Sequence, residues 1–123
     1  MVIGIGCDII EIVRIKKAVE RASFSERVFT PEEREYCSSR GLQAAASYAA
    51  RFAAKEAVLK ALGTGLRGGS LQEISITNDA LGKPQVTLTG FYQELAKGKG
   101  VTKIHITMSH SRENAMATCV LED

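Results

Sequence analysis

Tryptophan is absent from the 123-residue sequence, and only 6% of its residues are aromatic. Because proteins usually hold single-stranded nucleic acids by stacking the bases on aromatic side chains, we expect no stacking platform here. The formal net charge of +2 is also too small to indicate a nucleic-acid partner on its own. Composition therefore argues against nucleic acid as the main ligand.

Cysteine is scarce and scattered: Cys7, Cys37 and Cys119 are an odd number, and no two of them form a CxxC pair. This spacing argues against a disulfide framework and against a zinc site, and it is typical of the reducing cytosol. No apolar run is long enough to span a membrane. The apolar run at residues 2–7 has no basic segment before it, so it does not resemble a signal peptide. We therefore expect a cytoplasmic protein with no membrane partner.

The length fits one domain spanning residues 1–123. A long alanine-rich helix is predicted from about residue 42 to residue 62, with Gly63 as its stop signal. Shorter helices are expected at residues 8–21, 31–39 and 91–96, and strands at residues 2–7, 74–77, 85–89, 103–108 and 115–121. This order predicts an α+β fold in which a mainly antiparallel sheet packs against the long helix and the shorter helices, rather than a doubly wound parallel sheet.

Two of the predicted helices begin with capping signals. Thr30 is followed by Pro31 and, three residues after the cap, by Glu33, which is a strong signal for a helix start. Asp8 precedes Glu11 by three residues, so these two residues could open the first helix as a capping box.

The most informative segment runs from Phe52 to Lys60 in the long helix. Glu56 lies four residues after Phe52 and three before Leu59, so it is predicted to lie on the apolar stripe of that helix, flanked by Arg51 and Lys55. A carboxylate against an apolar face is costly unless a cation, a metal or hydrogen bonds accompany it. Taken alone, Glu56 and Lys60 are best explained as a helix ion pair worth about 0.2–0.5 kcal/mol.

Asp8 gives Glu56 a second interpretation. Asp8 follows the first predicted strand, where it could cap a helix or present a ligand on a rigid scaffold. Together Asp8 and Glu56 would supply two hard oxygen ligands, which is the usual protein contribution to a Mg²⁺ ion that also binds substrate phosphates. Lys60 would then face the same phosphates as a mobile positive charge.

Two loops could approach such a ligand. The segment Gly63-Thr-Gly-Leu-Arg-Gly-Gly69 lets the backbone come close, although glycine after a helix is usually only a stop signal. It matches neither the phosphate loop of NTPases nor the dinucleotide fingerprint. The segment Met108-Ser-His-Ser-Arg-Glu-Asn114 could bind phosphate or form a polar turn. A Ser–His hydrolase is disfavoured because the G-x-S-x-G turn is missing.

A basic segment follows the first predicted strand. Between positions 14 and 21 the sequence has four basic residues against the single acid Glu20: Arg14, Lys16, Lys17 and Arg21. A solvated helix face is the commonest explanation of such a run. The functional explanation is a docking surface for an acidic protein.

In this order and spacing, the segments resemble the holo-[acyl-carrier-protein] synthases, the small 4′-phosphopantetheinyl transferases of fatty acid biosynthesis. The resemblance extends over nearly the whole chain and is carried by Gly4-Ile-Gly-Cys-Asp8-Ile, Arg14-Ile, Phe29-Thr-Pro-Glu-Glu33, Arg51-Phe-Ala-Ala-Lys-Glu-Ala57 with Lys60, Gly63-Thr-Gly65, Gly82-Lys-Pro84 and Ser109-His-Ser111. Met108 and Asn114 stand where relatives often carry Ile and an aromatic residue.

The resemblance implies a Mg²⁺-dependent enzyme that transfers phosphopantetheine from coenzyme A to a serine of apo acyl carrier protein and releases 3′,5′-ADP. It implies that Asp8 and Glu56 bind the metal and that Arg14 and Arg21 dock the carrier protein. From the proposed phosphoryl transfer we expect Glu56, directly or through a metal-bound water, and Lys60 to be the catalytic residues. The resemblance also implies homotrimers with active sites between subunits. The residues that it places near coenzyme A are Arg51, Gly63, Thr64, Gly65, Lys83, Pro84, Ser109 and His110.

Two alternatives from other functional classes remain at this stage. A non-catalytic protein could bind coenzyme A or a nucleotide through the glycine loops, but it would have no need for Asp8 and Glu56 together. A basic RNA-binding module would use the positive helix, and its affinity would fall steeply with added salt.

Overall fold

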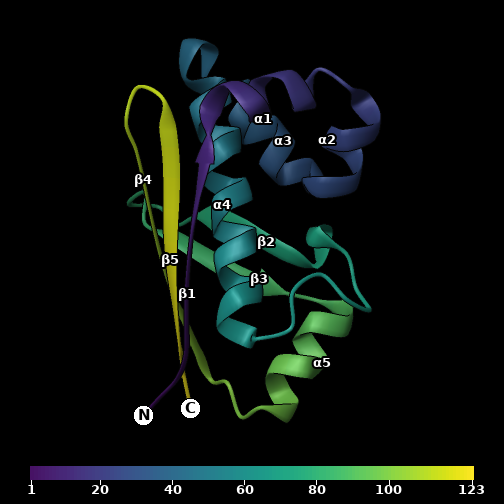
Figure 1. Ribbon diagram of the computed structural model, residues 1–123, viewed down its shortest axis with the longest axis vertical. Coiled ribbons are helices and arrows are strands. Elements are labelled where there is room, and N and C mark those ends of the chain that lie inside the picture. The colour runs from purple at the N-terminus through teal and green to yellow at the C-terminus, as the bar shows by residue number, and fades with distance from the viewer.

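The computed structural model describes all residues from Met1 to Asp123. Helix α4 (Ala44–Leu62) lies at the centre, with a three-stranded sheet on one side and the other helices and a two-stranded hairpin around the rest of it (Figure 1). The two chain ends lie together at one end of the sheet, where the Met1 ammonium group forms an ion pair with Asp123 at 2.7 Å. None of the helices has the length and apolar character needed to cross a membrane.

All strand pairs are antiparallel, which confirms the predicted fold class. The first sheet has the order β1-β5-β4, and the second is the β2-β3 hairpin. The strands are β1 (Val2–Glu11), β2 (Ile74–Asn78), β3 (Pro84–Leu88), β4 (Lys103–His110) and β5 (Asn114–Glu122). The other helices are α1 (Ile12–Val19), α2 (Ala22–Val28), α3 (Pro31–Ser38) and α5 (Gly90–Gly98), with short 3₁₀ turns at Gly41–Gln43 and Leu71–Glu73.

Local signals located two helix boundaries correctly. Helix α4 ends where Gly63 adopts a left-handed conformation with φ 81°, and Gly63 N–H donates to the carbonyl of Leu59 at 3.0 Å. Helix α3 begins at the predicted capping box, because Glu33 N–H donates to Thr30 Oγ1 at 3.2 Å and Thr30 N–H donates to Glu33 Oε1 at 2.8 Å.

The predicted capping box at Asp8 and Glu11 is wrong. Strand β1 continues through Glu11, where it pairs with Asn114 of β5, and α1 begins at Ile12 without a side-chain cap. The backbone pairing with β5 satisfies more hydrogen-bonding groups than a local cap could, so the strand extends past Asp8. The predicted helix at 8–21 therefore becomes a strand end followed by α1, and α2 was not predicted.

The apolar face of α4 is broader than the predicted stripe. Its alanines let both sheets and the first helices approach closely, so that Ala53, Ala54 and Ala57 are fully buried. The more open side of the helix carries Glu56, which is half-buried, and Lys60, which is exposed.

The charged residue that α4 does bury completely is Lys55, which the sequence placed at the edge of the stripe. Lys55 Nζ lies 2.8 Å from Glu33 Oε1 and donates to the carbonyls of Leu71 at 2.9 Å and Ile74 at 2.7 Å. Burial lowers the pKa of Lys55, and the charge of Glu33 opposes this effect. Glu33 Oε2 accepts a further hydrogen bond from Ile76 N–H at 2.7 Å, so the pair joins α3, α4 and β2.

Two glycines allow β1 to lie directly against α4. A Cβ atom on Gly6 would overlap the carbonyl oxygen of Ala57 and lie 2.6 Å from the backbone nitrogen of Ala61. A Cβ atom on Gly4 would overlap the carbonyl oxygen of Ala61. Because side chains alternate along a strand, the next residue that faces α4 is Asp8. The close contact therefore sets the position of Asp8 relative to the helix.

We predict that Gly6→Ala lowers the free energy of unfolding by about 1–3 kcal/mol, because overpacking at a tight contact forces the backbones apart. The matched control is Gly98→Ala, since a Cβ atom on Gly98 meets nothing within 4 Å. Chemical denaturation followed by circular dichroism measures both changes. Equal midpoints for the two variants would show that the contact between β1 and α4 tolerates a methyl group.

Candidate active site

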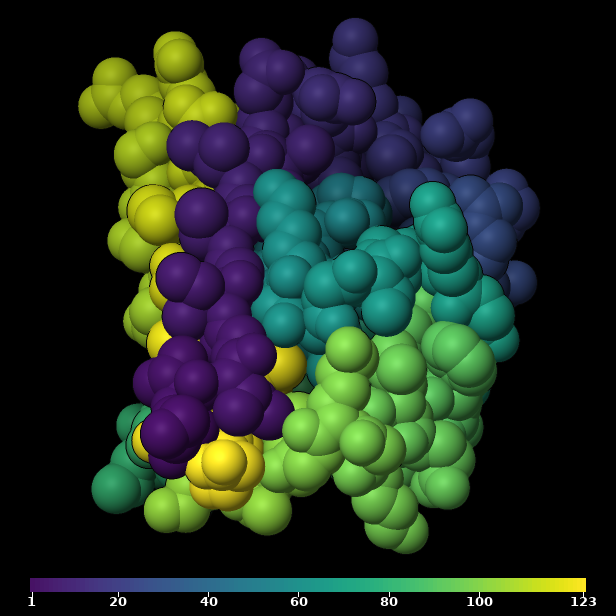
Figure 2. Space-filling model, turned by 60° about the horizontal axis from the view of Figure 1, so that its bottom comes forward, coloured from purple at the N-terminus to yellow at the C-terminus, as the bar shows by residue number.

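The centre of the candidate site is an ion pair between β1 and α4. Lys60 Nζ lies 3.0 Å from Asp8 Oδ1 and also donates a hydrogen bond to the backbone carbonyl of Cys7 at 3.0 Å. The Asp8 side chain is 17% exposed, whereas the Lys60 side chain is 55% exposed. Hydrogen bonding to Asp8 raises the pKa of Lys60, so the lysine is held in its charged form. In Figure 2 the purple N-terminal strand lies beside the teal segment that includes the end of α4.

Glu56 lies one turn before Lys60 on the same side of α4. Burial raises the pKa of its carboxyl group, the negative charge of Asp8 raises it further, and Lys60 acts in the opposite direction. Asp8 is therefore close enough for the two carboxylates to repel each other. The structure brings together the three residues that the sequence analysis placed at the reaction centre.

The donor set of this cluster fits Mg²⁺. Two carboxylates from two different elements provide hard oxygen ligands, and their mutual repulsion favours a cation between them. No group of three or more His, Cys, Asp and Glu residues is arranged to hold a metal. Two protein ligands suit an ion that takes its remaining ligands from water and phosphate, and they do not suit a tetrahedral zinc site.

The glycine loop continues directly from this cluster. Gly63 ends α4 one turn after Lys60, and Gly65 also has a positive φ of 66°. The side chain of Thr64 donates to the carbonyl of Gly65 at 3.2 Å. Tyr92 of α5 anchors the loop, because its hydroxyl accepts a hydrogen bond from Arg67 N–H at 2.9 Å. The loop is thus held beside the cluster and exposes backbone groups there.

Ser109 and His110 do not lie beside Asp8 within one chain. They end the edge strand β4, and β5 separates them from β1, which corresponds to about 10 Å across the sheet. His110 borders two cavities: one extends towards Ile9 and Met116, and the other is lined by Lys16, Leu42 and Arg112 among others.

Arg51 also lies away from the acidic pair. It is only 4% exposed, its Nη2 donates to Asn78 Oδ1 at 3.3 Å, and its guanidinium group lies 4.6 Å from the ring centre of Tyr36. Its Nε atom is buried without a hydrogen-bond partner. Five residues separate Arg51 from Glu56, a rotation of about 140° around the helix. The structure therefore places these two residues on different sides of α4.

Lys83 belongs to the turn of the β2-β3 hairpin, and Pro84 is the first residue of β3. Asp79 Oδ1 shapes this turn by accepting hydrogen bonds from the backbone N–H groups of Leu81 and Lys83, both at 2.9 Å. Lys83 and Pro84 line a small cavity that also includes His105 of β4. Like Ser109 and His110, they lie at β4 and not at the Asp8 cluster.

The basic residues predicted to dock a protein are accessible. Arg14 lies on the exposed side of α1, whose inward side buries Ile15, and Arg21 is exposed at the junction of α1 and α2. Arg14 and Arg21 form none of the ion pairs within the chain. Their charge is therefore available to a partner.

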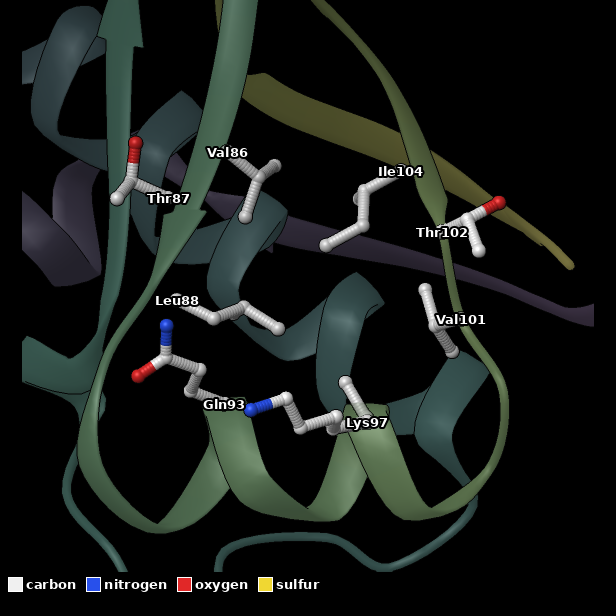
Figure 3. A pocket seen from close by; sticks show the side chains of 9 residues that line it. Val86, Thr87, Leu88, Gln93, Lys97, Val101, Thr102 and Ile104 are labelled. Carbon is white, nitrogen blue, oxygen red and sulfur yellow. The ribbon is translucent and has the colours of Figure 1, made fainter.

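A separate cavity of about 370 Å³ lies between β3, α5 and β4 (Figure 3). The apolar side chains of Val86, Leu88 and Ile104 extend into it, and Gln93 and Lys97 provide polar groups from α5. It contains none of the predicted site residues and no carboxylate. The cavity therefore lacks the acidic groups that the Asp8 cluster could use to bind a metal or to take up a proton.

Sequence reasoning missed how the glycines of β1 act. The sequence analysis used Gly4 and Gly6 only as part of the family pattern, whereas their role in the structure is to bring β1 against α4. The available signal was the alternation of Gly4, Gly6 and Asp8 along one face of a strand. A run of two glycines and an acid on one face indicates a strand pressed against another backbone.

Comparisons with known proteins point to one family. A family model described as the 4′-phosphopantetheinyl transferase superfamily matches residues 4–119. The holo-[acyl-carrier-protein] synthase of Geotalea daltonii is 50% identical over 125 residues, which cover 99% of this chain and 99% of that protein. The corresponding synthase from Clostridium tetani is 49% identical over 123 residues, which cover 99% of this chain and 97% of that protein.

The structure of the holo-[acyl-carrier-protein] synthase from Neisseria meningitidis superposes with a TM-score of 0.90 at 36% identity, covering 100% of both chains. The Bacillus anthracis synthase, described as a complex with CoA (3′,5′-ADP), superposes with a TM-score of 0.82 at 38% identity over 98% of this chain and 96% of that chain. The resemblance found in the sequence is thereby confirmed. The chain belongs to the 4′-phosphopantetheinyl transferase superfamily, within its group of holo-[acyl-carrier-protein] synthases.

Proposed function

We propose that this protein transfers the 4′-phosphopantetheine group of coenzyme A to a serine of apo acyl carrier protein, giving holo acyl carrier protein and 3′,5′-ADP. The observation that carries the proposal is the cluster of Asp8, Glu56 and Lys60 at the contact of β1 with α4. The relatives named for this reaction match nearly the whole chain, and one of them is described with coenzyme A in its structure.

Asp8 and Glu56 would hold a Mg²⁺ ion against the pyrophosphate of coenzyme A. When bound, the ion supplies positive charge that offsets the negative charge of the transferring and departing phosphates. Lys60 binds the same phosphates from the exposed end of the cluster, where its ammonium group stabilises the developing charge.

Glu56 is the proposed general base for the serine hydroxyl of the carrier protein, acting directly or through a water molecule. A general base must lie within reach of the proton it removes, and Glu56 lies beside Asp8 and Lys60 in the cluster that would hold the reacting phosphates. Thr64 and Gly65 expose backbone groups at the next turn of the chain, where they position the phosphates.

The raised pKa of Glu56 also affects the stability of the fold. Because the folded-state pKa is raised, the ionised carboxylate destabilises the fold above that pKa, and this cost disappears as the pH falls below the ordinary value. Replacing Glu56 by glutamine removes the cost at neutral pH. Stability and activity should therefore change in opposite directions.

The decisive experiment mixes the protein with apo acyl carrier protein, coenzyme A and Mg²⁺ and measures the mass of the carrier. The expected result is a carrier heavier by one phosphopantetheine group. Glu56→Gln should lower the rate at least about 100-fold, the usual contribution of a general base, with an unchanged or higher melting temperature. Normal turnover by this variant would remove Glu56 from the mechanism. No transfer by the unaltered protein with any metal would favour the non-catalytic binder of coenzyme A.

The proposed docking surface for the carrier protein is the exposed basic side of α1 with Arg14 and Arg21. Acyl carrier protein is the expected partner, and complementary charge would guide its encounter and fix its orientation. The double variant Arg14→Glu and Arg21→Glu should lower kcat/KM for the carrier at least about tenfold and leave the affinity for coenzyme A unchanged. Reversing Lys97 and Lys99 instead is the control of equal charge. Equal losses in both double variants would contradict a localised docking surface.

We also propose a homotrimer in which neighbouring subunits complete each active site. The outer face of the first sheet carries Ile5, Ile9 and Met116 at 69%, 65% and 43% exposure, an apolar patch of the kind that marks an interface. Arg51 and His110 lie away from Asp8 of the same chain. A second chain could therefore supply cationic side chains of this kind to the cluster.

Ile5→Glu should convert the trimer into monomers, because it places a charge in the middle of the patch. The control is Leu81→Glu, since Leu81 is even more exposed, at 96%, but lies at the hairpin turn, away from the sheet face. Light scattering measures the molar mass of both variants. A monomeric unaltered protein, or an unchanged mass for Ile5→Glu, would contradict this assembly.

The remaining expectations follow from the same reaction. We propose that residues 1–123 act as one domain in the cytoplasm, where coenzyme A and acyl carrier protein meet, and that the reaction serves fatty acid biosynthesis.

A further inference from the structure

Lys60 is paired with Asp8, whose carboxylate would have to bind the metal. It donates the one side-chain hydrogen bond that Asp8 accepts, at 3.0 Å, and a second hydrogen bond to the carbonyl of Cys7. It forms no ion pair with Glu56, although Glu56 is on the same helix one turn away. The lysine therefore has a defined position on Asp8, in addition to being near the cluster.

We propose that Lys60 acts as the resident cation of Asp8 and must leave this carboxylate when a divalent cation binds, which frees its ammonium group for the substrate phosphates. This inference rests on the proposed function and assigns Lys60 two successive positions. In the first it neutralises Asp8, and in the second it binds phosphate.

Burial explains why Asp8 needs a cation before any metal arrives. Its side chain is mostly buried between β1 and α4, and a buried carboxylate is costly without a partner. The close backbone contact at Gly6 keeps the strand, and with it Asp8, against the helix. Lys60 is the cation within reach, so the folded protein without metal has its two carboxylates partly neutralised.

The stem of Lys60 explains why the lysine can leave. More than half of the side chain is exposed, and four flexible carbons connect the ammonium group to α4. An ammonium group and a divalent cation repel each other strongly at one mostly buried carboxylate. With a divalent cation on Asp8, Lys60 would therefore turn outwards, towards the solvent side where phosphates would approach.

The two positions would link metal binding to catalysis. Coenzyme A without a metal would meet a lysine that is still engaged with Asp8 and Cys7. With the metal in place, the ammonium group would be free next to the glycine loop of Gly63, Thr64 and Gly65, which follows α4. Because Lys60 and the metal compete for Asp8, the metal would bind before Lys60 can bind the phosphates of coenzyme A.

The test measures Mn²⁺ binding to the full chain without coenzyme A, by electron paramagnetic resonance or calorimetry. Lys60→Met should bind Mn²⁺ at least about fivefold more tightly than the unaltered protein, because the competing ion pair is gone. Lys97→Met, which removes an exposed lysine outside the cluster, should stay within about twofold. Equal or weaker binding by Lys60→Met would overturn the proposal.

A second measurement separates displacement from a general effect of charge. The ammonium signal of Lys60 in ¹⁵N NMR spectra should be protected by its hydrogen bonds without metal, and saturating Mg²⁺ should move it to the position of a free lysine. An unchanged signal would show that Lys60 stays on Asp8. If either result fails while phosphopantetheine transfer proceeds normally, this inference is wrong and the proposed function stands; if transfer also fails, the proposed function falls with it.

Discussion

The position of Asp8 depends on a backbone contact between β1 and α4 that only glycine permits. Any side chain at Gly4 or Gly6 would overlap carbonyl oxygens of the helix, so both residues keep the strand at the shortest possible distance. This contact takes no part in the reaction, but it determines which side chains of β1 and α4 lie close together. It brings the third inward residue of the strand against Lys60, and it explains why an acid on a strand and two charged residues on a distant helix form one cluster.

The opposite side of α4 is fixed by a different interaction. Lys55 precedes Glu56 directly, and its ammonium group makes three contacts with Glu33 and two backbone carbonyls inside the core. Removing one partner of such a buried pair usually costs about 3–5 kcal/mol, because the remaining charge is stranded. Helix α4 is thus held by glycine contacts on one side and by a satisfied ion pair on the other. Glu56 gains a defined orientation from both, although neither involves its own side chain.

Short sequence patterns correctly predicted the features that depend on neighbouring residues alone. The end of α4 at Gly63 and the start of α3 at Thr30 follow from backbone conformation and capping, which a few neighbouring residues determine. The extension of β1 to Glu11 depends on pairing with Asn114, more than a hundred residues away, so the nearby capping pattern at Asp8 was misleading. The buried pair of Glu33 and Lys55 escaped prediction for the same reason. Two carboxylates and a lysine were recognised by their chemistry, whereas the glycines that bring them together were recognised only from the packing.

The distribution of cationic groups also limits how a single chain can hold coenzyme A. The molecule carries a pyrophosphate and, at a distance, a 3′-phosphate that remains on the 3′,5′-ADP product, so it needs two separate groups of positive charge. Lys60 supplies the first beside the carboxylates. The candidates for the second, Arg51, Lys83 and His110, lie on α4, the hairpin turn and the edge strand, away from the Asp8 cluster. An apolar outer sheet face beside that cluster offers a way to bring a second chain close. The separation of Lys60 from the other cationic residues within one chain would then explain both why the chains assemble and why a substrate with two distant phosphate groups needs that assembly.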